Sequence, residues 1–406
     1  MNRLLILIII ALFSINNITA QVVRDEYEKG KRYFKQKEYT KAKKKFSYVI
    51  NNNTAYYEAY TYRARIYLYQ NMPDSALEDF QSSIKMQNDF LPNYYYRAKY
   101  YYSIEDYSRA EKDLDFVIEN KPSFNPAILL RAKIYTINGN DNLAFADYNS
   151  AIENGTKNYK IFYQRGLYYS RTNKNSAAIE DFKKALSIKR KNADVWYALG
   201  FSHQKLAHNE EAIKAYSSAI GYEPKHKKAY IHRAQLYYLT NQLEKGLEDD
   251  KHIVSYFKLR SDSIFIRMAK AEIKIDNLPM ADRYLSKAIS ANAKSEEALL
   301  LRCDVAIKRD RAATGLSYLQ KIHRINPKND ESWYKQGEIY YNNKQYNKAI
   351  SALTSCIRIN NMPEAYYLRG ASYGAINNAD NACKDTRKAA SLGHVQAKKY
   401  QDRICK

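Results

Sequence analysis

Residues that interrupt helices are scarce in this chain. Its 406 residues include only 12 glycines and 8 prolines, whereas tyrosine alone occurs 40 times. Glycine and proline most often form turns and end helices, so the chain has little material for long loops. The composition therefore predicts a helix-rich protein.

Catalytic and metal-binding patterns are also lacking. The sequence contains no His-Glu-x-x-His helix and no glycine-rich loop that would cradle a phosphate. Its seven histidines are scattered: His203, His208, His226, His232, His252, His323 and His394. Hydroxyl and thiol side chains have no recognisable base partner, although a triad assembled only in space leaves no sequence signature. We therefore expect a protein that is not an enzyme and holds no metal and no cofactor.

Only one long apolar run occurs, and it lies early in the chain. Residues 4–13 are apolar, Arg3 precedes them, and a polar stretch then leads to the small Ala20. Such a run is about half of the roughly twenty residues needed to span a bilayer, and this order of segments is typical of an export signal. We predict a signal peptide over residues 1–20 and no integral membrane segment in the mature chain. The mature protein would be periplasmic, at the cell surface or released from a bacterium.

Acidic residues are outnumbered by basic ones. The formal charge is +23, and removal of Arg3 with the signal leaves +22. A basic balance often indicates nucleic acid or anionic surfaces as partners. The predicted export makes nucleic acid an unexpected partner. A general bias toward lysine, asparagine, isoleucine and tyrosine is the alternative explanation of the charge.

An internal repeat organises the rest of the sequence, most clearly over residues 193–226. A first helix carries Trp196, Leu199, Gly200 and His203, and a second segment carries Ala212, Tyr216, Ala219 and Pro224. This spacing resembles the tetratricopeptide pattern W-x2-L-G-x2-Y…A-x3-F…A…P, with His203 in place of the usual tyrosine.

Steps of 34 residues from that frame recover the same residue types at three places. The eighth place holds Gly30, Ala64, Ala98, Ala132, Gly166, Gly200 and Ala234; the eleventh holds Tyr33, Tyr67, Tyr101, Tyr135, Tyr169, His203 and Tyr237; the twentieth holds Ala42, Ala76, Ala110, Ala144, Ala178, Ala212 and Gly246. Small residues at the eighth and twentieth places let two helices of a hairpin approach, and aromatic residues fill the groove beside them. One hairpin cannot bury its apolar face alone, so neighbouring hairpins stack.

The repeat continues with two slips of one residue, near Ser261 and near Pro363. We predict eleven hairpins over residues 23–392, grouped as repeats 1–7 over 23–261 and repeats 8–11 over 262–392. Residues 393–406 carry Val395, Ala397 and Tyr400 at helical spacing, which predicts a capping helix. The resemblance implies an all-α, right-handed superhelical solenoid of tetratricopeptide hairpins.

Arginine at the seventh place occurs together with aspartate at the twenty-third. The pairs are Arg63 with Asp79, Arg97 with Asp113, Arg131 with Asp147, Arg165 with Asp181, Arg233 with Asp249, and Arg369 with Asp385. The sixth and tenth repeats lack both residues, and Arg302 alone lacks its aspartate and faces Tyr318. Co-occurrence within repeats predicts that each arginine contacts its aspartate in a structural pair.

All four cysteines lie in the last third of the chain. Cys383 and Cys405 are about equally far from the predicted turn at Gly393, so antiparallel helices would bring them together. An exported protein can form disulfides, and the alternative is two unpaired thiols. Cys303 and Cys356 occupy packing places and are expected to be buried free thiols.

The resemblance also implies where a partner would bind. In similar tetratricopeptide proteins the first helices line a concave groove, and the corresponding places here give cations interleaved with tyrosines: Tyr27, Lys31, Arg65, Tyr95, Lys99, Tyr102, Lys133, Tyr163 and Tyr197. Such a groove suits an extended acidic partner. The lysine and asparagine pattern of the chaperone-binding carboxylate clamp is not reproduced.

These features predict a non-catalytic protein-interaction scaffold that acts outside the cytoplasm, with possible association to the cell envelope. The alternative function is binding of an anionic polymer or glycan at the envelope. The alternative for the groove residues is an ordinary solvated face with helix-packing tyrosines.

Overall fold

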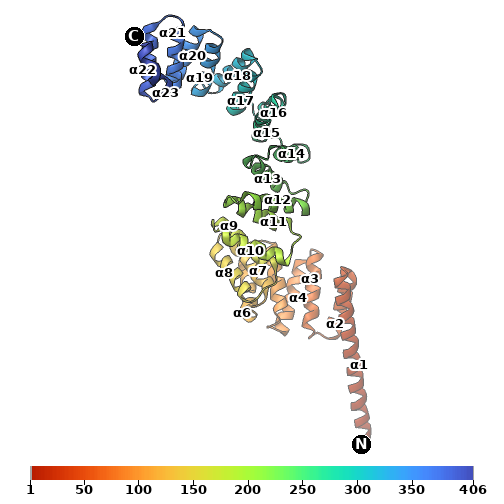
Figure 1. Ribbon diagram of the computed structural model, residues 1–406. Coiled ribbons are helices and arrows are strands. Elements are labelled where there is room, and N and C mark those ends of the chain that lie inside the picture. The colour runs from red at the N-terminus through yellow and green to blue at the C-terminus, as the bar shows by residue number, and fades with distance from the viewer. Residues whose placement is uncertain (1, 406) are drawn as a thin grey trace. The chain divides into compact units, whose positions relative to one another are not determined.

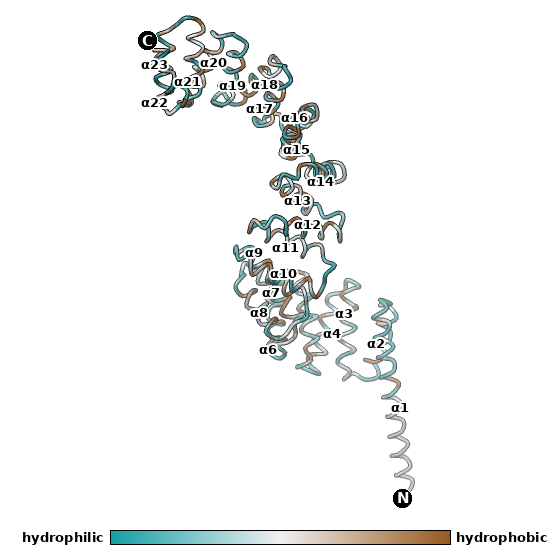
Figure 2. Tube along the Cα trace, in the orientation of Figure 1, coloured by the Kyte–Doolittle hydropathy of each residue, from teal (hydrophilic) through white to brown (hydrophobic). Residues whose placement is uncertain are grey.

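The computed structural model describes the backbone of residues 2–405 and the side chains of residues 19–399, 403 and 405. Within residues 2–405 every regular element is a helix, and there are 23 of them (Figure 1). From α2 onward, hydrophilic and hydrophobic residues alternate along each helix with a short period, as expected of amphipathic helices that pack on one side (Figure 2).

The helices form two compact units, which divide between His208 and Asn209. The first unit contains α1 (Asn2–Lys35), α2 (Tyr39–Asn52), α3 (Tyr57–Tyr69), α4 (Pro73–Met86), α5 (Leu91–Ser103), α6 (Tyr107–Asn120), α7 (Asn125–Ile137), α8 (Asp141–Glu153), α9 (Tyr159–Arg171), α10 (Asn175–Ile188) and α11 (Ala193–Lys205). The first helix thus begins within the segment predicted as a signal peptide and continues into the first hairpin. No helix in the described part of the chain has both the length and the apolar character required to cross a membrane.

The second unit contains α12 (Asn209–Tyr222), α13 (Lys227–Leu239), α14 (Leu243–Ser255), α15 (Asp262–Lys274), α16 (Leu278–Ala291), α17 (Glu296–Lys308), α18 (Ala312–Ile325), α19 (Asp330–Asn342), α20 (Tyr346–Ile359), α21 (Pro363–Ala375), α22 (Ala379–Ser391) and α23 (Val395–Ile404). Within each unit, consecutive helices pack against one another. The first helices of neighbouring hairpins also touch, as α3 does with α5 and α5 with α7. The predicted fold class, an all-α solenoid of helical hairpins, is confirmed.

The turn inside each hairpin shows the same backbone conformation. One residue per turn has a positive φ: Lys37, Asn71, Glu105, Gly139, Asn173, Ala207, Asn241, Asp276, Asp310, Lys344 and Asn377. A left-handed residue after a helix lets the chain reverse while the last carbonyl groups stay hydrogen-bonded. These eleven positions are 34 residues apart except at the two slips, where the step into Asp276 is one longer and the step into Asn377 one shorter. The longer step contains a further left-handed residue, Lys258, between α14 and α15.

Small residues determine how closely the two helices of a hairpin approach. Ala98 and Ala110 are fully buried where α5 meets α6. At Gly166 on α9 the requirement is stricter, because a Cβ atom would lie 2.6 Å from Cε1 of Phe182 on α10. The glycine thus provides the space that the phenylalanine ring fills, in line with the small residues expected at the eighth place.

The last helix covers the end of the second unit. Ala397 on α23 is fully buried against Ala389 and Ala390 of α22, with Tyr366 and Tyr367 of α21 beside them. His394 at the preceding turn stacks on Tyr367, with ring centroids 4.3 Å apart. Helix α23 therefore acts as the capping helix that the sequence predicts.

Candidate interaction groove

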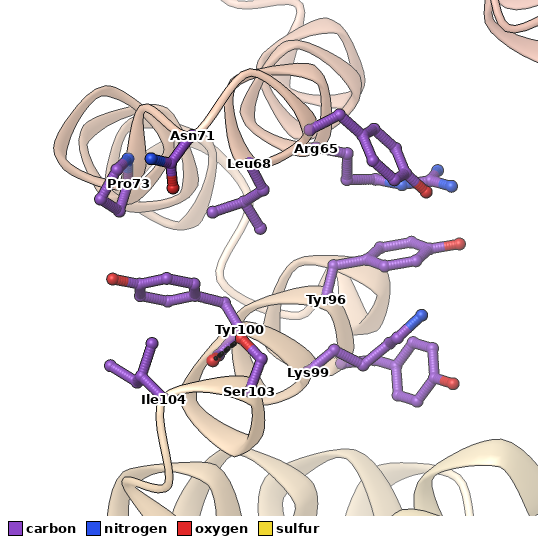
Figure 3. A pocket seen from close by; sticks show the side chains of 11 residues that line it. Arg65, Leu68, Asn71, Pro73, Tyr96, Lys99, Tyr100, Ser103 and Ile104 are labelled. Carbon is purple, nitrogen blue, oxygen red and sulfur yellow. Dashed lines mark hydrogen bonds between the residues drawn. The ribbon is translucent and has the colours of Figure 1, made fainter.

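A cavity of about 500 Å³ lies between the first helices of two neighbouring hairpins, α3 and α5. Its walls come from α3, from the turn and first residue of α4, and from α5 with the residue that follows it (Figure 3). The lining residues are Arg65, Leu68, Tyr69, Asn71, Pro73, Tyr95, Tyr96, Lys99, Tyr100, Ser103 and Ile104. The volume falls within the range of roughly 300–1,000 Å³ that is usual for ligand pockets.

A second cavity of about 450 Å³ adjoins the first, because Tyr95 and Lys99 line both. Its other walls are Pro126, Leu129, Leu130 and Lys133 of α7, and Asn158 and Lys160 at the start of α9. The Asn158 side chain accepts a hydrogen bond of 3.1 Å from the Lys160 backbone N–H, which caps α9 and holds its first turn in place. We call the two cavities together the α3–α9 groove.

Four cations line the α3–α9 groove without a carboxylate partner. These cations are Arg65, Lys99, Lys133 and Lys160. Among the described residues, no carboxylate oxygen lies within 4.0 Å of their side-chain nitrogens. The three lysines are exposed, and Arg65 is half-buried. An anion in the groove would therefore meet positive charges that no internal pair neutralises.

Aromatic rings hold the two cations of the first cavity. The Arg65 guanidinium carbon lies 3.8 Å from the ring centroid of Tyr96 and 4.4 Å from that of Phe34. The Lys99 ammonium lies about 6 Å from the rings of both Tyr95 and Tyr96. Such cation–ring contacts stabilise the side chains by roughly 0.5–1 kcal/mol each at exposed sites. They also leave the hydrogen-bond donors of Arg65 in its plane free for a ligand, because stacking uses only the face of the guanidinium group.

Burial raises the pKa of Tyr95 above its usual value, and the nearby Arg65 only partly opposes that effect. The Tyr95 hydroxyl therefore stays protonated at neutral pH and can donate a hydrogen bond to an anion. The site thus combines positive charge, hydroxyl donors and flat apolar surface.

Four of the nine residues predicted for the groove meet in it: Arg65, Tyr95, Lys99 and Lys133. Lys31 is instead paired with Glu28 at 2.8 Å and lies over the Tyr27 ring. Tyr27 itself is only 8% exposed, because Phe46, Tyr56 and Tyr62 surround its ring in the core of the first two hairpins.

The three remaining predicted tyrosines are half-buried and line neither cavity. Their rings pack against neighbours on the same or the next helix: Tyr102 against Tyr107, Tyr163 against Phe182, and Tyr197 against Phe201. Burial raises the pKa of Tyr163 to about 12. These contacts are those of packing side chains.

Sequence reasoning missed part of the lining. Lys160 lies on α9, a first helix of the kind that the resemblance expects to line the groove, so its position could have been predicted. Tyr96 and Ile104 occupy places that were not read as groove-lining, and no sequence signal singles them out.

Comparison with known families identifies some of the hairpins. A model described as "TPR repeat" matches residues 167–206, and one described as "Tetratricopeptide repeat" matches residues 193–226 and 330–361. These segments are tetratricopeptide repeats. No curated protein matches the chain.

Solved structures also resemble parts of the chain or most of it. The YrrB structure, described as a TPR protein with an unusual peptide-binding site, is 17% identical with a TM-score of 0.39, over 44% of this chain and 92% of YrrB. PilF of Pseudomonas aeruginosa is 17% identical with a TM-score of 0.39, over 50% of this chain and 91% of its own. The Cut9–Hcn1 structure aligns over 93% of this chain and 95% of its own, at 12% identity and a TM-score of 0.40. Arrays of tetratricopeptide repeats are generally protein-interaction modules.

Six of the hairpins contain an arginine that binds an aspartate through two parallel hydrogen bonds. Arg63, for example, donates from Nε and Nη2 to the two carboxylate oxygens of Asp79, both at 2.8 Å. The same geometry occurs at Arg97–Asp113, Arg131–Asp147, Arg165–Asp181, Arg233–Asp249 and Arg369–Asp385. The aspartates are 4–6% exposed, so these pairs belong to the packing between helices and lie outside the groove.

In most of these arginines the remaining terminal nitrogen, Nη1, donates a hydrogen bond to the preceding repeat. Nη1 of Arg131 donates to Asp115 at 2.7 Å, and Nη1 of Arg165 donates to Asn149 at 2.9 Å. Corresponding contacts join Arg63 to Ser47, Arg233 to Ser217 and Arg369 to Thr354. One guanidinium group thus links the second helices of two successive repeats, which the single ammonium nitrogen of lysine could not do with this geometry.

The pairing uses a carboxylate of another repeat at Arg267 and Arg302, on α15 and α17. Arg302 contacts the Tyr318 ring at 4.9 Å, as its sequence position suggests, but it also donates to Asp282 on α16 at 2.8 Å. Arg267 likewise pairs with Asp250 on α14, at 2.5 and 3.0 Å. In both cases the carboxylate belongs to the preceding repeat, so a search at the twenty-third place of the same repeat does not find it.

Proposed function

We propose that the chain is a non-catalytic interaction scaffold that binds an extended acidic protein segment in the α3–α9 groove. The observation that carries this proposal is the row of four unpaired cations, two of which, Arg65 and Lys99, lie against tyrosine rings. Carboxylates of a partner would dock on Arg65, Lys99 and Lys133 in succession. Tyrosine side chains add rigid contact area and lose little conformational entropy when a partner binds. They therefore favour the bound state of the partner segment.

Charge reversal in the groove tests the proposal. We expect Lys99→Glu/Lys133→Glu to weaken binding of a glutamate- and serine-rich peptide about a hundredfold, because two attractions of about 0.7 kcal/mol each become repulsions of similar size. The measurement is the anisotropy of a labelled peptide titrated with the full chain. The matched control is Lys112→Glu/Lys183→Glu, which changes the net charge equally on exposed residues of α6 and α10. Equal loss in both double variants would mean that overall charge, and not the groove, attracts the peptide.

Salt separates this function from the alternative, binding of an anionic polymer such as an acidic glycan. Polymer binding rests on many screened charges and should collapse as ionic strength rises. A peptide that also fills the cavities should keep measurable affinity. If heparin binds the wild-type chain more tightly than the peptide and both interactions vanish together in salt, the anionic-polymer function is the correct one.

We also propose that the protein acts outside the cytoplasm of a bacterium, at or near the envelope. The support is the order of Arg3, the apolar residues 4–13 and Ala20. We expect protein produced in a bacterial host to start at Gln21 and to lie in the periplasmic or extracellular fraction. Amino-terminal sequencing of the fractionated protein measures this. A cytoplasmic product that retains Arg3 would contradict the proposal.

A further inference from the structure

We infer that the α3–α5 cavity takes one large apolar side chain, best an aromatic one, from the acidic segment, while the neighbouring acidic residues lie along Lys99, Lys133 and Lys160. This inference rests on the proposed function and adds an anchor residue to it. A segment with acidic residues alone would then be an incomplete ligand.

The lining of the first cavity is divided into two halves. One half is largely apolar: Leu68 and Pro73 lie on one side with Asn71 between them, and Tyr100 and Ile104 lie on the other with Ser103 nearby (Figure 3). The other half carries Arg65 and Lys99 with the Tyr96 ring between them (Figure 3). A carboxylate alone would satisfy only the cationic half. A ligand that places an apolar group beside a carboxylate would match both.

The first cavity is open to a ligand in the chain as it stands. Tyr69 is 61% exposed and Ile104 is 48% exposed, although both are large apolar or aromatic side chains. Burial of such surface against a partner is favourable by about 25 cal/mol per Å². Aromatic walls at Tyr69, Tyr95 and Tyr100 would also make edge or offset contacts with an aromatic ligand ring.

The adjoining cavity continues the row of cations along which the acidic residues of the bound segment would lie. Lys99 belongs to both cavities, Lys133 lies on the next first helix, and Lys160 lies at the start of α9. The cations thus follow the anchor cavity in one direction across α5, α7 and α9. A bound segment would place its apolar residue at the α3 end and its acidic residues toward α9.

Four labelled peptides test the anchor, each capped at both ends so that no terminal carboxylate contributes. Two carry a phenylalanine before or after a run of glutamates, and two carry serine at the same positions. We expect one of the phenylalanine peptides to bind the full chain about tenfold or more tightly than its serine counterpart, as burial of one such side chain predicts. Ile104→Ser should reduce that ratio severalfold. The matched control is Ile137→Ser at the end of α7, because Ile137 is 51% exposed and lines neither cavity.

The outcomes distinguish a failure of the anchor inference from a failure of the proposed function. If phenylalanine and serine peptides bind equally while Lys99→Glu/Lys133→Glu weakens both, the groove binds acidic segments and the anchor inference is wrong. If no peptide binds, the proposed function fails together with the anchor. Thermal unfolding of both isoleucine variants should match that of the wild type, since each change lies on an exposed side chain.

Discussion

Replacement of Asp113 by alanine will destabilise the first unit by about 3–5 kcal/mol. Asp113 is 5% exposed and accepts two hydrogen bonds from Arg97, at 2.7 and 2.8 Å. The variant leaves the Arg97 guanidinium half-buried between α5 and α6 without its carboxylate, and that desolvated charge is the source of the loss. Because stability in a repeat array is largely local, the loss will appear first as faster amide hydrogen exchange in α5 and α6.

The matched control is an exposed ion pair, which joins two neighbouring hairpins. Arg171 lies 2.9 Å from Asp141, and both side chains are at least 40% exposed. Arg171→Ala should change the free energy of unfolding by less than about 1 kcal/mol, because solvent screens such pairs. An Asp113→Ala variant that behaves like this control in urea titrations would show that the buried pairs contribute no more than surface pairs.

A double replacement identifies the physical origin of the effect. Arg97→Met/Asp113→Leu removes both charges and fills similar volume with apolar atoms, so it should recover most of the stability lost in Asp113→Ala. A double variant as unstable as the single one would point instead to lost hydrogen-bond geometry or packing.

The register of the repeats could be predicted because the packing that sets it is local. A small residue at Gly166 and a ring at Phe182 are sixteen residues apart and meet within one hairpin, and each hairpin repeats the same contact. Left-handed turn residues such as Asn71 follow from the same period. The cations of the groove could be predicted for a similar reason, since Arg65, Lys99 and Lys133 occupy one helical place in successive repeats.

A contact could not be predicted where several groups of similar chemistry lie within reach of the same side chain. Arg302 has carboxylates and a ring within reach, and its bond to Asp282 depends on the orientation of two successive hairpins, not on the spacing within one. Tyr27 occupies a groove-lining place, yet neighbouring rings such as that of Tyr56 cover it. The apolar half of the anchor cavity depends on Ile104, whose exposure follows from the end of α5. A repeat pattern therefore predicts which helix face a residue shares, and the side chains around it decide whether a ligand can reach it.

Loss of the disulfide between Cys383 and Cys405 will release the capping helix. The two sulfurs are bonded in the structure, and the bond joins α22 to the end of α23. Closing a loop of 22 residues stabilises the folded chain by about 3 kcal/mol on the chain-entropy model. Among the side chains that the structure describes, those buried between α22 and α23 are alanines such as Ala397, and alanine buries little apolar area. We therefore expect Cys383→Ser/Cys405→Ser to make α23 accessible to limited proteolysis while the helices up to α20 keep their amide protection.

Counts of reactive thiols with and without reductant provide the control for the disulfide prediction in the same protein. Burial raises the pKa of Cys303 to about 12 and that of Cys356 to about 11, so both thiols stay protonated and unreactive in the folded chain at neutral pH. Denatured wild-type protein should show two reactive thiols without reductant and four with it, whereas the double serine variant should show two in both conditions. Reductant should likewise expose α23 to protease in the wild type and have no further effect in the variant. Four thiols in oxidised, denatured wild-type protein would mean that the bond does not form. The cap would then depend on contacts such as those of Ala397 and His394. In that case Cys383→Ser/Cys405→Ser would leave the proteolysis of α23 unchanged.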